Sequence, residues 1–470
     1  MTRQFSSLFL ALMLGCNSSS QSPIESESPE SADESLTDKP KPGATERAKP
    51  TREGADWPQL LGEKRDGVSP ETGISKTWPK EGLKKLWDCK LGAGYAPPSV
   101  VKGKLYHFDR FDDVARLTCR NAESGELIWK YEYATDYQDL YGYDAGPRAG
   151  PVVDGEQVFL HGVDGLVVAL NAADGKEQWK VDTKKTYHVH QNFFGAGSVP
   201  LVVGDLLIVP IGGSPKGARP FDLRDAKGDG SAIVAFDRKT GAEKYRSGDE
   251  LASYSSPILA TFHGKKTVLY FARGGLLGFD PETGKQRFYQ KWRSKLEESV
   301  NAANPVVVGD RILVTECYEK GSLCLEVQKD FALKEVWSDL GKDRGEQSLM
   351  AHWCTPMLDG KHIFGCSARH SPQADFRCVE FSTGNLAWIE TKTRWTTAIK
   401  IDGHLLTLSE DGTLALVKLN PEKYEKVAQW TGEKNPDLEY PCWAPPVVSR
   451  GLLYVRGKGK LVCYELIAKR

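Results

Sequence analysis

The sequence has no excess of charge of either sign, because 62 lysine and arginine residues stand against 63 aspartate and glutamate residues. Proteins that bind nucleic acid through its phosphates carry a basic patch or a basic balance, so this composition disfavours that class of function. The sequence also lacks a long apolar stripe at helical spacing, a glycine-rich phosphate loop and a C-x-x-C-H haem motif. No serine, histidine and aspartate have the spacing of a nucleophile with its base. The informative feature is a repeat.

A short phrase recurs along the chain: a small residue, a glycine six positions later, and an aromatic residue four positions after that. It reads CRNAESGELIW from Cys119, ALNAADGKEQW from Ala169, AFDRKTGAEKY from Ala235, GFDPETGKQRF from Gly278 and CVEFSTGNLAW from Cys378. Self-similarity at a period of about 40 to 65 residues is typical of a repeat architecture. Each copy contains short alternating or apolar runs separated by turn residues, which predicts a four-stranded meander, the unit of a β-propeller blade.

The aromatic residues that end the units give a count of blades. They are Trp129, Trp179, Tyr245, Phe288, Trp337, Trp388 and Trp430. An eighth blade is expected to be split, with PPVVSRGLLYVRGKGKLVCYELI supplying its inner strands and LKKLWDCKL around Trp87 its outer strand. We therefore predict one all-β domain over residues 56–470, an eight-bladed propeller of antiparallel blades closed by N- and C-terminal strands, with an insertion at residues 212–231.

The first 16 residues resemble a bacterial lipoprotein signal. Arg3 provides a positive start, Phe5 to Leu14 a short apolar run, and Met13-Leu14-Gly15-Cys16 ends like a lipobox. This predicts lipidation at Cys16; the alternative is a cleaved secretory signal in which Cys16 is incidental. Residues 17–55 are rich in Ser, Pro, Glu and Lys, which predicts a disordered polar tether. Asn17 is not the aspartate of inner-membrane retention, so we expect an outer-membrane anchor facing the periplasm, and a monomer.

The repeated phrase resembles the tryptophan-docking repeat of pyrroloquinoline quinone (PQQ) β-propellers. The resemblance implies that Trp129, Trp179, Tyr245, Phe288 and Trp388 stack between neighbouring blades. It also implies one of two functions: a PQQ- and calcium-dependent alcohol or sugar dehydrogenase, or a scaffold of the BamB type in outer-membrane protein assembly. The dehydrogenases often cap the quinone with a disulfide between adjacent cysteines, and this sequence has no adjacent cysteine pair. The comparison favours the scaffold and leaves the enzyme as the alternative.

Polar and aromatic residues are enriched where each innermost strand begins, and they predict a funnel at the centre of the ring. The candidates are Tyr95, Arg148, Gln191, Asn192, Tyr254, Asn301, Asn304, His352, Trp353, Arg394, Trp395 and Trp443. Such a concave site suits an envelope protein partner or a small planar anionic ligand. The alternative is that these side chains hydrogen-bond to one another and close the centre of the ring.

Several residues are of types that can bind a metal ion. Glu298, Asn301 and Asn304, with Asp249 and Glu250, are of the types that Ca²⁺ prefers, but their spacing does not specify a site. The insertion Asp222-Leu223-Arg224-Asp225-Ala226-Lys227-Gly228-Asp229-Gly230 lacks the closing glutamate of a calcium loop. His188 and His190 would face one side of a strand, yet a third ligand is missing from the motif. We therefore predict no metal site, with PQQ and calcium kept for the alternative function.

Five of the ten cysteines carry a structural expectation. Cys119 and Cys378 occupy the small position of the repeated phrase, and Cys324 and Cys463 are expected in corresponding strands, where they would act as small apolar residues. Cys317 and Cys324 are the best candidates for a disulfide, because they would face each other across a hairpin that turns at Lys320-Gly321.

Overall fold

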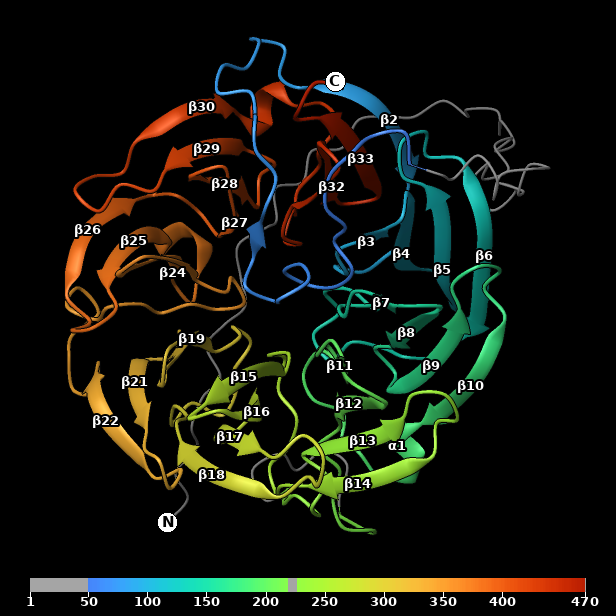
Figure 1. Ribbon diagram of the computed structural model, residues 1–470, viewed down its shortest axis with the longest axis vertical. Coiled ribbons are helices and arrows are strands. Elements are labelled where there is room, and N and C mark those ends of the chain that lie inside the picture. The colour runs from blue at the N-terminus through green and yellow to red at the C-terminus, as the bar shows by residue number, and fades with distance from the viewer. Residues whose placement is uncertain (1–49, 219–225, 470) are drawn as a thin grey trace, which may run out of the picture. The chain divides into compact units, whose positions relative to one another are not determined.

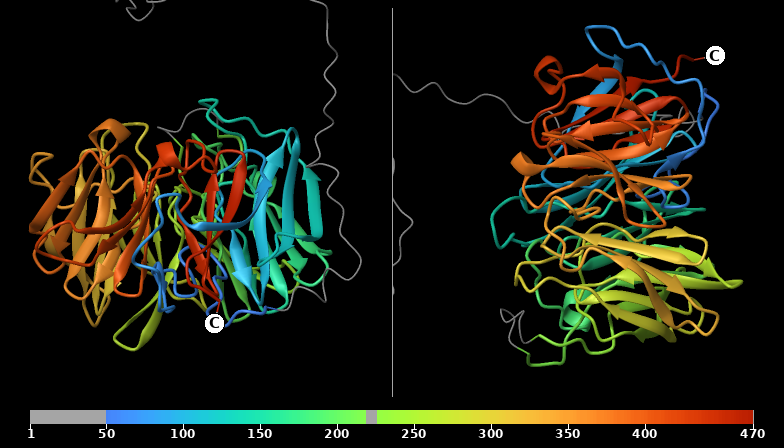
Figure 2. Two further views of the ribbon diagram at one scale, coloured as in Figure 1. Left: turned by 90° about the horizontal axis from the view of Figure 1, so that it is seen from above. Right: turned by 90° about the vertical axis from the view of Figure 1, so that its left-hand side faces the viewer.

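The chain folds into a ring of eight sheets, seen face-on in Figure 1 and from the side in Figure 2. This computed structural model describes residues 50–218 and 226–469. The predicted signal with Cys16, most of the predicted tether and part of the insertion (219–225) lie outside the described residues. Each sheet has four antiparallel strands, and one carries an additional parallel strand. The predicted eight-bladed propeller is therefore confirmed.

The strands follow one another from the centre of the ring outwards, blade by blade. Blades 1 to 4 consist of β3 (Ser99–Val101), β4 (Lys104–Phe111), β5 (Val114–Asn121) and β6 (Leu127–Ala134); β7 (Val152–Asp154), β8 (Gln157–His161), β9 (Leu166–Asn171) and β10 (Glu177–Asp182); β11 (Leu201–Val203), β12 (Leu206–Pro210), β13 (Ile233–Asp237) and β14 (Glu243–Ser247); and β15 (Ile258–Phe262), β16 (Lys265–Phe271), β17 (Gly275–Phe279) and β18 (Gln286–Lys291).

Blades 5 to 8 complete the ring. They consist of β19 (Val306–Val308), β20 (Arg311–Glu316), β21 (Gly321–Val327) and β22 (Leu333–Ser338); β23 (Met357–Asp359), β24 (His362–Ser367), β25 (Asp375–Glu380) and β26 (Leu386–Thr391); β27 (Thr396–Ile401), β28 (His404–Ser409), β29 (Leu414–Lys418) and β30 (Lys426–Trp430); and β31 (Val447–Ser449), β32 (Leu452–Gly457), β33 (Lys460–Glu465) and β2 (Lys84–Lys90). β2 pairs with β33, so the eighth blade is closed by both ends of the chain as predicted.

Helical structure is scarce among the described residues. It comprises α1 (Thr183–Thr186) and two short 3-10 turns, Ser371–Gln373 and Gly432–Lys434. No helix within residues 50–218 and 226–469 is long and apolar enough to cross a membrane.

The outer strands carry a ring of aromatic side chains, here called the aromatic belt: Trp87, Trp129, Trp179, Tyr245, Phe288, Trp337 and Trp388. Each pairs across the sheet with the small residue of its own blade, namely Cys463, Cys119, Ala169, Ala235, Gly278, Cys324 and Cys378. The strand register shifts beside every pair, as a β-bulge does. A larger residue opposite the ring would displace it, which explains why this position alternates among Cys, Ala and Gly.

Most belt residues also contact the next blade. Trp179 illustrates this: its indole N–H donates to the Arg238 carbonyl at 2.9 Å, and its ring lies against Gly241. Gly241 has φ +73°, and a Cβ there would lie 2.7 Å from the indole. The turn therefore needs glycine for both backbone conformation and close approach. Buried apolar clusters lie at these blade interfaces, so the core is distributed around the ring.

The seventh blade departs from the repeat. Trp430 pairs with Leu414, and the position that corresponds to the belt pairs Leu416 with Ala428. The Trp430 ring lies against Gly82, just before β2, and contacts Tyr464 at 5.5 Å between ring centroids. Trp430 therefore ends its blade as predicted, but it packs where the two ends of the chain meet.

A segment before β2 covers one end of the ring's centre and appears in blue in Figure 1. Trp57 pairs with Val100 of blade 1, and β1 (Val68–Ser69) pairs in parallel with β27 of blade 7. Between them, the buried Arg65 donates to the carbonyls of Val199 and Pro257, at the starts of blades 3 and 4. Residues before position 56, the predicted domain boundary, already contact the propeller: Arg52 donates to the Ile467 carbonyl at 3.0 Å. The boundary stays a prediction.

Candidate functional site

A cavity of about 470 Å³ lies at the centre of the ring. Leu60 and Leu61, from the segment that covers one end, form its floor. The loops that lead into the innermost strands form its walls, so its mouth is at the opposite end. Because these loops differ from blade to blade, the cavity is lined by residues that do not follow the repeat.

Most of the funnel residues proposed from the sequence line this cavity. They are Tyr95, Arg148, Tyr254, Asn304, His352, Trp353, Trp395 and Trp443. The structure thus brings together residues from the loops that lead into seven of the eight blades, although these residues are up to 348 positions apart in the sequence.

Three tryptophans form one wall. The ring centroids of Trp353 and Trp395 are 4.8 Å apart, and those of Trp353 and Trp443 are 5.5 Å apart. All three indole N–H groups donate to protein acceptors: the Trp443 carbonyl at 3.2 Å, the Ala368 carbonyl at 3.2 Å and the Glu410 carboxylate at 3.1 Å. With their polar atoms satisfied, these side chains offer the cavity apolar ring surface, which binds by stacking and apolar contact.

A second aromatic group lines the cavity next to the tryptophans. Phe194 and Tyr254 lie 5.7 Å apart between ring centroids, and the Tyr254 hydroxyl accepts a hydrogen bond from the Phe194 amide at 2.7 Å. Arg148 lies over the rings of Phe194 and Tyr95 at 5.5 and 5.8 Å. Its guanidinium donates to the Asp139 carboxylate at 2.8 Å, so its charge is already balanced by the protein.

Two neutral groups give the cavity unused hydrogen-bonding capacity. Asn304 accepts from the Ser256 amide at 2.7 Å through its oxygen, while its buried Nδ2 has no partner among the described residues. His352 contacts the Tyr318 hydroxyl through Nε2 at 2.9 Å, and its Nδ1 likewise lacks a partner there. Burial lowers the pKa of His352 to about 4, with the charge of Arg369 as a smaller cause, so the imidazole is neutral at physiological pH.

Four proposed funnel residues lie elsewhere. The Asn301 amide is buried and donates to the Ala272 carbonyl at 2.8 Å, so it holds backbone together. Arg394 has φ +56° and points to the Asp411 carboxylate, 3.6 Å away, outside the cavity. Gln191 and Asn192 line a separate cleft. Their assignment to the central funnel is therefore corrected, because loop backbone conformation, not position before a strand, sets the side-chain direction.

A calcium-held quinone does not fit the residues present. No carboxylate lines the described part of the central cavity, and no group of three or more His, Cys, Asp and Glu within residues 50–218 and 226–469 could hold a metal. Glu298 pairs with Arg369 at 2.5 Å, and Glu250 accepts from the Gly274 amide at 2.8 Å. The aromatic walls suit a planar ring, but the acidic candidates are bound elsewhere.

The histidine pair also fails to form a ligand set. His188 and His190 lie in the loop after α1, not on a strand. His188 is exposed and has φ +52°, whereas His190 is buried. The expected alternation along a strand is wrong for this segment, since the backbone turns at His188.

The predicted disulfide is wrong as well. The cysteines of the described chain are free, and the β20–β21 register pairs Cys324 with Leu313 and Glu316 with Gly321. Cys317 therefore lies in the turn between β20 and β21, three residues before Lys320, and cannot face Cys324. Cys324 instead packs beside Trp337 in the belt.

The fold and the cavity define a class: a PQQ-repeat propeller with an aromatic site at its centre. A family model described as outer membrane protein assembly factor BamB matches residues 74–215 and 195–390. The chain therefore belongs to this family of propellers.

Relatives with two different names resemble parts of the chain. Quinohemoprotein alcohol dehydrogenase ADH-IIG of Pseudomonas putida is 30% identical over 153 residues, covering 32% of this chain and 19% of the enzyme. Outer membrane protein assembly factor BamB of Xanthomonas campestris is 27% identical over 113 residues, covering 23% of this chain and 27% of that protein. The matches thus span less than a third of either relative.

Solved structures divide in the same way. BamB from Moraxella catarrhalis superposes with a TM-score of 0.53 at 15% identity, covering 82% of this chain and 97% of that one. Quinohemoprotein alcohol dehydrogenase from Comamonas testosteroni gives 0.58 at 14% identity, covering 88% and 81%. At such identities the likeness establishes the fold and leaves the choice of function to the site.

Proposed function

We propose that the protein is a binding propeller of the cell envelope that holds a partner protein at the mouth of its central cavity. The observation that carries this proposal is a group of exposed apolar side chains around the mouth. Leu140, Tyr141 and Tyr143 lie in the loop before β7, and Tyr440 lies in the loop before β31. Tyr143 and Tyr440 are 67% and 53% exposed, and both also line the cavity. Exposed aromatic groups at a concave site are typical of protein-binding surfaces.

The geometry of these tyrosines supports the same function. Tyr141 stacks on Phe193 with ring centroids 5.8 Å apart and an interplanar angle of 23°, and it contacts Tyr143 at 6.3 Å. Rings held by their neighbours lose little freedom on binding, so they can anchor a partner at low entropic cost.

The relatives and the sequence support the proposed location of the protein in the cell envelope. The family description and the BamB relative from Xanthomonas campestris refer to outer-membrane protein assembly. We further propose lipidation at Cys16, with the tether keeping the propeller near the outer membrane on its periplasmic face. Replacement of the thiol by Cys16→Ser should move the protein from the membrane fraction to the soluble fraction; retention in the membrane would argue against the anchor.

The partner-binding proposal is tested by site-specific photo-crosslinking in intact cells. A photoreactive residue at position 143 and, separately, at position 440 should give the same discrete adduct, identified by mass spectrometry. Position 389 is the matched control, because Ile389 is exposed on β26 at the outer rim. If positions 143 and 440 give no adduct, or the same adduct as position 389, the mouth is not the binding surface.

A second candidate is a PQQ-dependent periplasmic oxidoreductase acting on an alcohol or sugar. The aromatic lining of the cavity and the dehydrogenase relatives favour it, although the calcium ligands are lacking. A cofactor that binds only the folded protein must raise its melting temperature. The purified protein is therefore heated with PQQ and Ca²⁺ and with PQQ and a chelator, and assayed for dye reduction on alcohols and sugars. An unchanged melting temperature without dye reduction would remove this candidate.

A further inference from the structure

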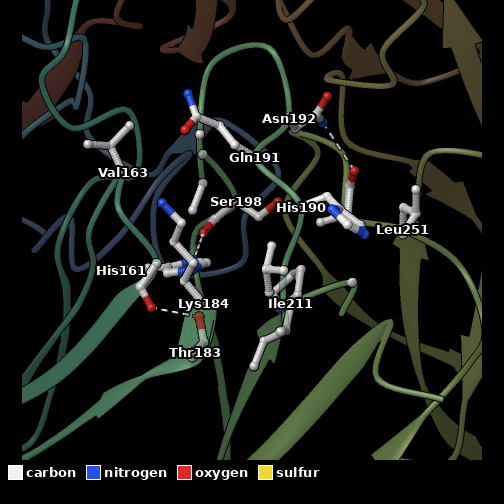
Figure 3. A pocket seen from close by; sticks show the side chains of 18 of the residues that line it. His161, Val163, Thr183, Lys184, His190, Gln191, Asn192, Ser198, Ile211 and Leu251 are labelled. Atoms are coloured by element: carbon white, nitrogen blue, oxygen red, sulfur yellow. Dashed lines mark hydrogen bonds between the residues drawn. The ribbon is translucent and has the colours of Figure 1, made fainter. Parts of the chain in front are cut away.

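A second cleft lies between blades 2, 3 and 4, beside the central cavity. It has a volume of about 50 Å³ and is lined by residues from β8, α1 and the loop after α1, seen in Figure 3, and by Arg273, which follows β16. One buried water needs about 10–15 Å³ of such space, so the cleft has room for a few waters or one small oxyanion. Gly197 lines both this cleft and the central cavity, so only a short segment separates them.

Arg273 brings a buried positive charge to the cleft. It is 2% exposed, and its guanidinium donates to two neutral acceptors, the Asn192 side-chain oxygen at 3.1 Å and the Glu297 carbonyl at 3.2 Å. Its Nε–H has no partner among the described residues. Burial lowers the pKa of Arg273 to about 10, which still leaves the side chain charged at neutral pH. The nearby carboxylates of Glu297 and Glu250 partly balance the charge of Arg273. A buried guanidinium with an unused donor is still costly unless an anion or water completes its hydrogen bonds.

His190, in the loop after α1, provides a second unused polar atom. It is 9% exposed, and its Nε2 has no partner within the described chain. The neighbouring Asn192 is held in place by the Ala252 carbonyl, 3.3 Å from its Nδ2. Two residues that each have a buried nitrogen atom without a partner among the described residues therefore line the same cleft.

Lys184 adds a cation at the entrance. It lies on α1 and lines both the cleft and the larger surface hollow that leads to it, as does His190. Asp164 is the carboxylate in the described lining, and it already accepts from the Tyr133 hydroxyl at 3.3 Å and the Leu166 amide at 3.1 Å. Within the cleft, Arg273 and Lys184 thus outweigh Asp164, whereas the surface hollow outside is also lined by Asp113, Asp136 and Asp182.

We propose that this cleft binds a small oxyanion, a carboxylate or phosphate group. The group would be held by Arg273 and His190 and attracted by Lys184. Charge-assisted hydrogen bonds from a buried arginine are the strong contacts for such groups. The inference goes beyond the proposed function, since the cleft and the mouth tyrosines are separate sites. The anion is either free in solution or the terminal carboxylate of a peptide.

The test is calorimetric titration of the purified protein at constant ionic strength with inorganic phosphate, acetate, and a short peptide with a free or an amidated C-terminus. Saturable binding of one of these anions is expected. Lys184→Gln should weaken it about threefold to tenfold, the loss of one charge-assisted contact. Lys185→Gln is the matched control: Lys185 follows directly in α1 but pairs with Asp182 at 2.9 Å and should leave affinity unchanged.

A second variant examines the buried donor. Arg273→Lys keeps the charge but removes the planar set of donors, and it should weaken binding more than Lys184→Gln does. If Arg273→Lys fails to fold, the comparison of Lys184→Gln with Lys185→Gln still decides whether the cleft binds the anion. Phosphate or acetate binding identifies a free anion, and binding of only the free-carboxylate peptide identifies a chain terminus. Absence of saturable binding for all ligands, or equal affinity of both lysine variants, would overturn the proposal.

Discussion

The aromatic belt and the cavity mouth both consist of aromatic side chains, but they obey different rules. In the belt, each ring meets a small residue of its own sheet and most also contact the following blade, as Trp179 does with Ala169 and Gly241. At the mouth, Tyr143, Phe194 and Trp443 come from loops that share no pattern. Residues that recur from blade to blade therefore hold the ring together, whereas residues that differ between blades are free to bind another molecule.

The largest expected effect is on the belt. Trp179→Ala removes an 8%-exposed ring and its hydrogen bond to Arg238, and it should lower the free energy of unfolding by about 3–5 kcal/mol. Denaturant unfolding followed by circular dichroism measures this. Lys180→Ala, the exposed next residue on β10, is the control and should change it by less than about 0.5 kcal/mol. Equal costs for the two variants would contradict the assigned role of the belt.

A smaller effect should appear in the pH dependence of the free energy of unfolding, through Glu316 behind the mouth. Desolvation raises the pKa of Glu316 to about 7, against the amide hydrogen bonds from Tyr318 and Lys320. The protonated Glu316 carboxyl contributes about 3 kcal/mol to the free energy of unfolding. This contribution is fully present below about pH 4.5 and is lost as the pH rises through about 7.

Glu316→Gln should flatten that pH dependence. The quantity to measure is the difference in unfolding free energy between wild type and variant from pH 4.5 to 8. His352 acts in the opposite direction, because its lowered pKa costs stability as the pH falls from about 6.5 to 4, and the difference cancels its contribution. A difference that stays constant with pH would show that Glu316 ionises normally.

The smallest effect on stability is expected at the mouth itself. Tyr143→Ala removes a side chain that is mostly in solvent, so unfolding should change by less than about 0.5 kcal/mol. Partner capture, measured by crosslinking from position 440 in this variant, should nevertheless fall severalfold. Unfolding as severe as that of Trp179→Ala would place Tyr143 in the structural core and remove the contrast between the two regions.

Part of the candidate site could be predicted from sequence because the starts of the innermost strands converge in any propeller. Trp353, Trp395 and Trp443 were found in this way, and they do line the cavity. Asn301 and Arg394 were misplaced, since one amide turns inward to backbone carbonyls and one residue adopts a left-handed conformation. The floor residues Leu60 and Leu61 were missed, because no local pattern indicates that their segment returns across the ring.

The amino-acid sequence by itself determined the number of blades, their closure and the belt, because strand alternation and residue size act between neighbours in the sheet and between adjacent repeats. Only the tertiary structure decided how the covering segment and the second cleft are built. Arg65 reaches blades 3 and 4 from the N-terminal segment, and Arg273 meets Asn192 across two blades. Those contacts join residues 81 to 192 positions apart, and their geometry depends on the closed ring that places the loops side by side.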